Sequence, residues 1–195
     1  MTPATANSFP HRWTARVLDK PPLIAPARQF TYPVRVPGEE EAMNRGALLV
    51  EVTPASGGTF LAICALGYRD PSLPSGIFSC PNPNDILFVA GGYAYLVPSL
   101  EPAHCLHLSL RPVSELVALQ DQNLLLLGGI NRIEALGPDG LAWKSERLSW
   151  EGITLHRIEG NTLHGIGWDM RNNRDVPFEL DLQTGTHTGG GFSRH

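Results

Sequence analysis

Three residues of metal-ligand type stand close together in the chain: His104, Cys105 and His107. If this segment is a strand, Cys105 and His107 share one face and His104 lies on the other. A zinc site takes three or four His, Cys, Asp or Glu ligands, so one here would need more from elsewhere. No second pair with metal-ligand spacing follows. We therefore favour a polar strand end with a buried thiol, and keep as the alternative a small hydrolase or metal-dependent enzyme that uses these three residues.

The segment 168–175, with the sequence WDMRNNRD, is the most polar turn of the chain. It carries Asp169, Arg171 and Arg174 beside Trp168. Arginine side chains bind carboxylate or phosphate groups through two parallel hydrogen bonds, so this turn could recognise a charged ligand. The simpler interpretation is a hairpin turn whose asparagines accept a positive φ, with its charges paired at the surface. We favour the turn, and keep the four side chains as candidate ligand- or partner-binding residues.

Aromatic side chains offer a second candidate binding surface. Tyr93 and Tyr95 alternate in sequence, so they should share one face of a strand. Tyrosine and tryptophan are enriched at the centres of protein interfaces, which makes such a face suitable for a partner. Core packing explains most aromatic residues more simply, because each ring buries a large area.

The sequence contains none of the local motifs that mark common catalytic sites. It has no nucleophile elbow, no HExxH zinc motif, no phosphate-binding loop and no dinucleotide fingerprint. Seven histidines are scattered along the chain, so a triad assembled in space stays open. We therefore predict a non-enzymatic binding or protein-interaction module with an unknown protein or small-molecule partner, and no cofactor.

Composition narrows the classes of partner. The net charge is −4 and no dense Lys/Arg cluster occurs, which argues against nucleic acid. No run of about 18 apolar residues is present, so we expect no membrane span. The N-terminus lacks the apolar region of a secretory signal, and the three cysteines have neither zinc nor disulfide spacing. We expect reduced thiols in a bacterial cytoplasm.

Residues 1–37 differ in composition from the rest. They contain seven prolines, five basic residues and one acidic residue, a net charge of +4 that leaves −8 for the remainder. Proline excludes a long helix and disfavours regular strand, so we predict an extended arm beside a single all-β domain, 38–195. The arm could lie on an acidic surface of its own chain or of a neighbour, and so support a homo-oligomer. A structural subunit assembled through this arm is a further alternative. The acidic run 39–41 that follows is predicted to be solvated.

Apolar runs separated by turn signals predict sequential antiparallel hairpins over most of the domain. A Gly-Asn pair at 160–161 joins predicted strands 153–159 and 162–168. A two-residue loop fixes the register, so residue 159 should pair with 162, and 153 with 168. We expect the face with Ile153 and Trp168 to point to the core. Glycines at 165 and 167 leave the other face open to a ring or strand. In the next strand, positions 178, 180 and 182 should point inward.

A weak internal period accompanies these hairpins. Gly-Gly pairs begin at 57, 91 and 128, separated by 34 and 37 residues. The segment 178–185, FELDLQTG, is similar to the LDLxTG end of quinoprotein-type β-propeller blades, and 133–140 ends in a comparable turn. This resemblance covers about 75 residues and implies about four or five blades of four strands. It implies no cofactor. We predict a propeller-like all-β fold, with a two-sheet β-sandwich or barrel as the alternative.

A long segment with four prolines, residues 67–85, is predicted to be an irregular loop. Loops of this length are uncommon in compact domains unless they are functional. We expect the binding surface to combine this loop, the strand with Tyr93 and Tyr95, and the turn at 168–175.

Overall fold

The structure is a computed structural model that describes residues 4–24 and 26–192. It is all-β, and the helices in the described residues are two short 3-10 turns, η1 (Ala42–Arg45) and η2 (Pro102–His104). None of the described helices is long and apolar enough to cross a membrane. The strands form four sheets of four or five strands each.

The first sheet has the order β2-β4-β5-β3 (Trp13–Leu18, Ala47–Pro54, Phe60–Ala65, Arg28–Tyr32). The second has the order β1-β6-β7-β8-β9 (Ala4–Ala6, Gly76–Ser79, Asp85–Ala90, Tyr93–Pro98, Leu106–His107). The third is β10-β11-β12-β13 (Val113–Leu119, Leu124–Gly129, Ile133–Gly137, Gly140–Lys144). The fourth is β14-β15-β16-β17 (Ile153–Glu159, Thr162–Asp169, Arg174–Asp181, His187–Gly189).

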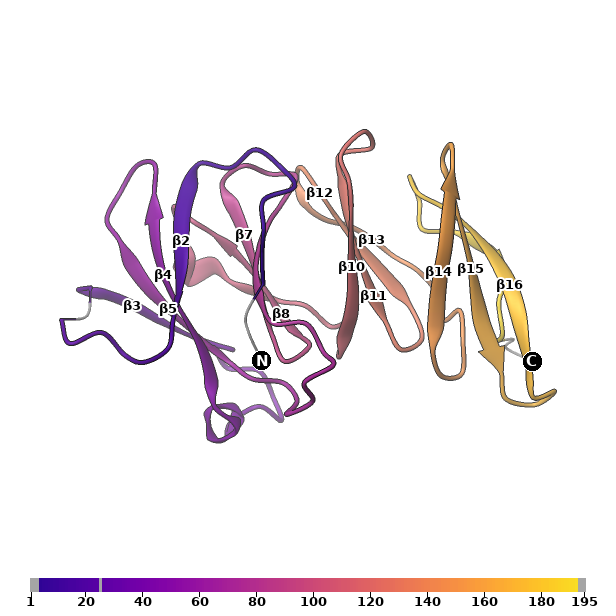
Figure 1. Ribbon diagram of the computed structural model, residues 1–195, viewed down its shortest axis with the longest axis horizontal. Helices are drawn as coiled ribbons and strands as arrows, with labels where there is room; N and C mark the ends of the chain where they lie inside the picture. The colour runs from indigo at the N-terminus through magenta and orange to yellow at the C-terminus, as the bar shows by residue number, and fades with distance from the viewer. Residues whose placement is uncertain (1–3, 25, 193–195) are drawn as a thin grey trace.

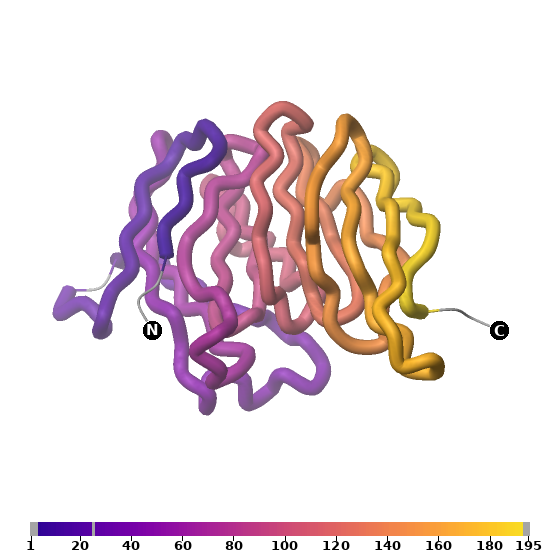
Figure 2. The backbone as a smooth tube through the Cα atoms, turned by 45° about the vertical axis from the view of Figure 1, so that its right-hand side comes forward, coloured from indigo at the N-terminus to yellow at the C-terminus, as the bar shows by residue number. Residues whose placement is uncertain are grey.

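The four sheets stand in a row (Figure 1) and, apart from β1, which joins the second sheet, follow one another in chain order. Figure 2 shows the same row turned, with the first and fourth sheets at opposite ends. Three apolar core layers fill the spaces between neighbouring sheets. In β7, Ile86 and Phe88 enter the first layer while Leu87 and Val89 enter the second. The inner sheets are therefore buried on both faces, and a two-sheet sandwich, which has one core layer, does not describe this chain.

The segment that we predicted to be an extended arm supplies strands to two sheets. β1 pairs in parallel with β6, β2 pairs antiparallel with β4, and β3 pairs in parallel with β5. The expectation of little regular strand therefore needs correction. The prolines at 10, 21, 22, 26, 33 and 37 all lie in the connections, so they leave the short strands between them uninterrupted.

The predicted hairpin at 153–168 forms, with one shift in register. Near the turn the pairing is as expected, and Glu159 lies opposite Thr162. A β-bulge leaves His156 without an opposite residue, so Ile153 pairs with Gly167 and not with residue 168. An extra residue of this kind moves every later side chain of the strand to the other face.

For the same reason the predicted core face is right for β14, where Ile153 packs against the core, and wrong for β15, where Trp168 is not on the buried face. The buried face carries Leu163 and Gly165, and Ile153 packs against it from beyond the bulge. The ring of Phe178 lies over Gly165, where an added Cβ would come within 2.3 Å of Cζ. The expected close approach of a ring to the glycine face is therefore confirmed. The inward direction of the next strand is confirmed as well, since Phe178, Leu180 and Leu182 are buried.

Candidate functional site

A pocket of about 480 Å³ opens where the first and second sheets meet the loop after β5. We call it the Arg45–Arg69 pocket. Its lining comes from the end of η1, the start of β4, the segment 66–75 and the β7–β8 turn. The lining residues are Arg45, Ala47, Leu48, Leu66, Tyr68, Arg69, Pro71, Ser75 and Gly91.

Backbone hydrogen bonds fix the wall of this pocket to the β7–β8 turn. The amide of Tyr68 donates to the carbonyl of Gly91 at 2.9 Å, and the amide of Gly91 donates to Ser75 Oγ at 2.8 Å. Gly91 has φ of +56°, and a Cβ there would lie 2.4 Å from the carbonyl oxygen of Tyr68. Glycine is required at this turn both for its backbone angle and for the close approach of the loop.

Two arginines supply the charge of the pocket. The Arg69 guanidinium donates to the carbonyls of Asn44, at 3.2 Å, and Arg45, at 3.4 Å. Arg45 donates through Nε to the carbonyl of Leu66 at 2.7 Å. Among the described lining residues there is no carboxylate. The pocket therefore combines apolar lining residues with two positively charged ones.

Behind the pocket lies a buried carboxylate, Glu39, whose side chain is 8% exposed. Its Oε2 accepts a hydrogen bond from Arg45 at 2.6 Å, and its Oε1 pairs with Arg111 at 3.0 Å. The hydroxyl of Tyr93 also donates to Oε1, at 2.5 Å. Burial pushes the pKa of Glu39 up, but the hydrogen bonds from Tyr93 and Arg45 and the two positive charges hold it below its usual value. Glu39 is ionised at neutral pH and holds Arg45 in place.

An aromatic stack supports this carboxylate from the core. The imidazole of His107 stacks on the ring of Tyr95, with centroids 4.7 Å apart and an interplanar angle of 17°. It also contacts the ring of Tyr93 at 5.0 Å. Both ring nitrogens are buried and lack a hydrogen-bond partner among the described residues. Burial, with a smaller effect from Arg111, lowers the pKa of His107 to about 4, so the ring is neutral at pH 7.

Tyr93 and Tyr95 share one face of β8, and both lie in the core, not on an exposed patch. Tyr95 is fully buried and donates its hydroxyl to the carbonyl of Ala65 at 2.8 Å. The ring of Tyr93 lies under the Arg45 guanidinium, with 5.2 Å from Cζ to the ring centroid. Tyr93 therefore helps to position the Arg45 guanidinium, while Tyr95 packs in the core, and neither ring is exposed.

The three candidate metal ligands do not lie on one strand. His104 ends η2 at the surface, where its Nδ1 lies 2.8 Å from Glu101 Oε2, while β9 begins only at Leu106. Cys105 is half-buried against the first core layer, and His107 points into the aromatic stack. In the part of the chain that the structure describes, no group of three or more His, Cys, Asp or Glu side chains could hold a metal ion.

In the polar turn at 168–175, the side chain of Asp169 forms hydrogen bonds to the backbone of the turn. Asp169 Oδ1 accepts hydrogen bonds from the amides of Arg171, at 3.0 Å, and Asn172, at 3.3 Å. Asn173 has φ of +47°, as expected for an asparagine in a tight turn. Trp168 is half-buried in β15, and Arg174 begins β16. The turn belongs to the fourth sheet, so it lies at the far end of the row from the Arg45–Arg69 pocket (Figure 1).

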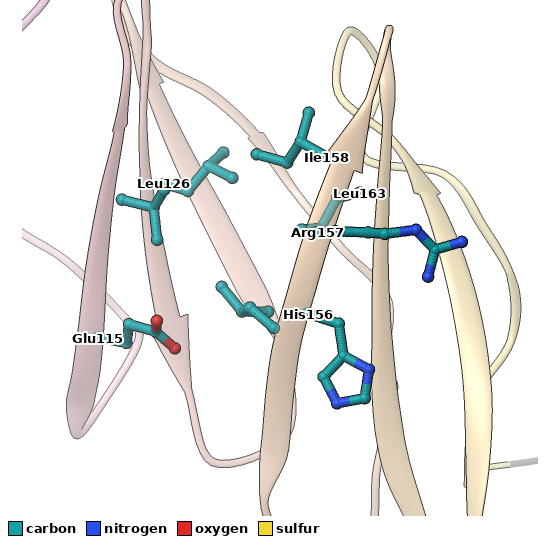
Figure 3. Close-up of a pocket in the computed structure, with 8 residues that line it drawn as sticks. Glu115, Leu126, His156, Arg157, Ile158 and Leu163 are labelled. Carbon is teal, nitrogen blue, oxygen red and sulfur yellow. The ribbon is translucent and has the colours of Figure 1, made fainter.

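A second hollow lies between the third and fourth sheets and is smaller, at about 180 Å³. Leu126, Ile158 and Leu163 occupy the space between the strands, while Arg157 and His156 point away from it (Figure 3). This gap is an apolar seam between two sheets. Ligand pockets are typically about 300–1,000 Å³, which favours the Arg45–Arg69 pocket as the candidate site.

We predicted the run 39–41 to be solvated, and this is wrong for Glu39, whose side chain is buried. Its three partners lie 6, 54 and 72 residues away along the chain. No local pattern connects positions so far apart. The segment 67–85, predicted to be an irregular loop, contains β6, and its first part lines the pocket. Tyr68 of this segment contacts the ring of Tyr93, with centroids 5.8 Å apart. The third part of the expected surface, the turn at 168–175, does not join them.

No protein-family model and no curated protein matches this chain, so its function has to be inferred from the site itself.

Proposed function

We propose that this protein is a non-enzymatic binding module whose ligand is a small molecule with an apolar body and a carboxylate group. The observation that carries this proposal is the Arg45–Arg69 pocket, which has about 480 Å³ of space and is lined by apolar side chains and two arginines. A pocket of this size, lined by apolar side chains with few polar groups, is typical of small-molecule sites. Arginine is the side chain that best matches a carboxylate.

The two arginines have different roles in this proposal. Arg45 is already paired with Glu39, so it contributes mainly to the shape and rigidity of the pocket. The hydrogen bonds of Arg69 go to two neutral carbonyl oxygens, which orient the guanidinium without cancelling its charge. Arg69 is therefore the residue that we expect to bind the ligand carboxylate. Leu48 and Leu66 would contact the apolar body.

The state of Glu39 supports binding over acid–base catalysis. This carboxylate lies beside the pocket but already accepts hydrogen bonds from Arg45, Arg111 and Tyr93. Its lowered pKa makes it a poor proton carrier near neutral pH.

We also propose a propeller-like arrangement of the sheets and a cytoplasmic location. Sheets of four or five strands that, apart from β1, follow one another in chain order support the first. The turn after β16 adds to it, since Asp181 Oδ1 accepts hydrogen bonds from the amides of Gln183 and Thr184, both at 2.9 Å. The free state of all three cysteines supports a reducing compartment.

Calorimetric titration with octanoate tests the proposed ligand class. We expect saturable binding of one octanoate per chain and weaker binding of octanol, which has the same chain and no charge. Arg69→Gln should weaken octanoate binding about tenfold or more, because it removes a charge-assisted hydrogen bond. The matched control is Arg28→Gln, since Arg28 also donates to a backbone carbonyl, that of Gly58, but does not line the pocket.

Equal affinities for octanoate and octanol would contradict the role of the charge. An unchanged affinity in Arg69→Gln would remove this pocket from consideration.

A further inference from the structure

A second polar pocket, of about 420 Å³, lies beside the connection between the third and fourth sheets. We call it the Arg147 pocket. It is separate from the Arg45–Arg69 pocket and shares no residue with it. Its lining residues are Arg132, Lys144, Ser145, Glu146, Arg147 and Phe192.

The guanidinium of Arg147 is held in one orientation by neutral groups. Its Nε donates to the carbonyl of Ser149 at 2.9 Å, and its Nη2 donates to the carbonyl of Trp150 at 2.8 Å. Its Cζ lies 4.5 Å from the ring centroid of Phe192 and 5.0 Å from that of Trp150. The two rings contact each other at 4.9 Å. The Arg147 guanidinium is therefore held in place while none of these hydrogen bonds goes to a carboxylate. Because it is already ordered, less conformational entropy is lost when an anion binds to it.

The other charges at this pocket leave an excess of positive charge. Lys144 is paired with the buried carboxylate of Glu134 at 3.1 Å and also contacts Ser109. Glu146 lies near His187: burial lowers the pKa of that ring, and the charge of Glu146 opposes the shift only in part. Three cations, Arg132, Lys144 and Arg147, therefore face two carboxylates. The excess is one positive charge, and the two guanidiniums, Arg132 and Arg147, offer more N–H donors than the two oxygens of a carboxylate accept, which suits the three terminal oxygens of a phosphate group.

We infer that the Arg147 pocket binds the phosphate group of a small phosphate monoester, with Arg147 and Arg132 as the phosphate ligands. Phe192 lines the same pocket and would contact the organic part of the ester. An ester with an aromatic group should therefore bind more tightly than inorganic phosphate, because stacking adds to the charge interaction.

Trp150 supplies a local reporter for this site. Its ring lies against Arg147, so its indole N–H resonance should shift when phosphate binds. We propose a titration of the ¹⁵N-labelled full chain with inorganic phosphate, phenyl phosphate and phenol, followed through the four tryptophan indole signals. The Trp150 signal can be assigned with Trp150→Phe.

We expect phenyl phosphate to shift the Trp150 signal at concentrations at least threefold below those needed for inorganic phosphate, and phenol to have no effect. Arg132→Gln and Arg147→Gln should each weaken binding about tenfold. Arg132 is exposed, so the Arg132 variant should leave the fold intact even if the Arg147 variant disturbs the connection between the third and fourth sheets.

Arg171→Gln is the matched control. Arg171 also lies over the Trp150 ring, at 5.8 Å, but it does not line the pocket, so its loss should change the affinity less than twofold. The inference is overturned if the Arg132 variant binds phosphate as tightly as the wild type, or if the Arg171 variant loses as much affinity as the Arg132 variant. Equal binding of phenyl phosphate and inorganic phosphate would overturn the assignment to an ester.

Discussion

Acidification should destabilise this protein through His107. The ring is half-buried against two tyrosines, and its pKa is lowered to about 4 from the value of about 6.5 for an exposed histidine. The unfolded chain therefore binds a proton at a pH where the folded protein does not. The contribution of the neutral ring to stability is complete above pH 6.5 and is lost as the pH falls toward 4. Arg111 and Arg45 oppose protonation, while Glu39 favours it.

The size of this effect follows from the shift in pKa. Each pKa unit corresponds to 1.36 kcal/mol, so the free energy of unfolding should fall by about 3 kcal/mol through this group alone. Because the ring is only partly removed from water, we expect a measured loss of about 2 kcal/mol. His107→Phe keeps a ring against Tyr95 but cannot titrate, so this part of the pH dependence should disappear.

Urea unfolding followed by tryptophan fluorescence at pH 7 and pH 4.5 measures the effect. The wild-type protein should lose about 2 kcal/mol more than His107→Phe between the two pH values. At pH 7 the variant should be as stable as the wild type or more stable, because it removes two buried nitrogens that lack partners. His104→Gln is the control, since His104 lies at the surface. If His107→Phe and the wild type lose stability equally on acidification, the reasoning is refuted.

Three further predictions test the packing around the site and the cores. Glu39→Gln should lower the free energy of unfolding in urea by about 2 kcal/mol, because it leaves Arg45 and Arg111 without a counter-charge. The control Glu40→Gln changes an exposed side chain and should have a much smaller effect. Gly165→Ala should lower the melting temperature and cost about 1–3 kcal/mol of folding free energy, because its Cβ would overlap the Phe178 ring. The control Gly58→Ala should melt like the wild type, because the nearest atom to its Cβ is an Arg28 side-chain atom at 3.9 Å. Burial raises the pKa of all three thiols, so a thiol reagent at pH 8 should label the native protein slowly and the denatured protein at three sites; rapid labelling of the folded chain would contradict the buried positions.

Much of the sheet structure can be predicted from short patterns. β7 has a continuous apolar sequence because both of its faces are buried, while β16 alternates because only one of its faces meets a core. The Gly-Gly pair at 91–92 marks a tight turn, where both residues have positive φ. These features depend on neighbours in the sequence, so a single sequence reveals them.

Other features depend on contacts that are distant in the chain. The bulge at His156 has no residue-type signal, and because of it the core face predicted for β15 was wrong, while that of β14 was right. β3 pairs in parallel with β5 across a long connection, so its short Arg28–Tyr32 segment between prolines could not be recognised as a strand. The ion pair between Glu39 and Arg111 joins positions 72 residues apart. Its location depends on how the sheets pack, which local propensity does not determine.

A crystal structure of the protein with octanoate would test the proposed function most directly. We predict that the carboxylate lies within hydrogen-bond distance of the Arg69 guanidinium and that the alkyl chain packs against Leu48 and Leu66, which line the Arg45–Arg69 pocket. Octanoate bound elsewhere on the protein, with only water in this pocket, would contradict the account.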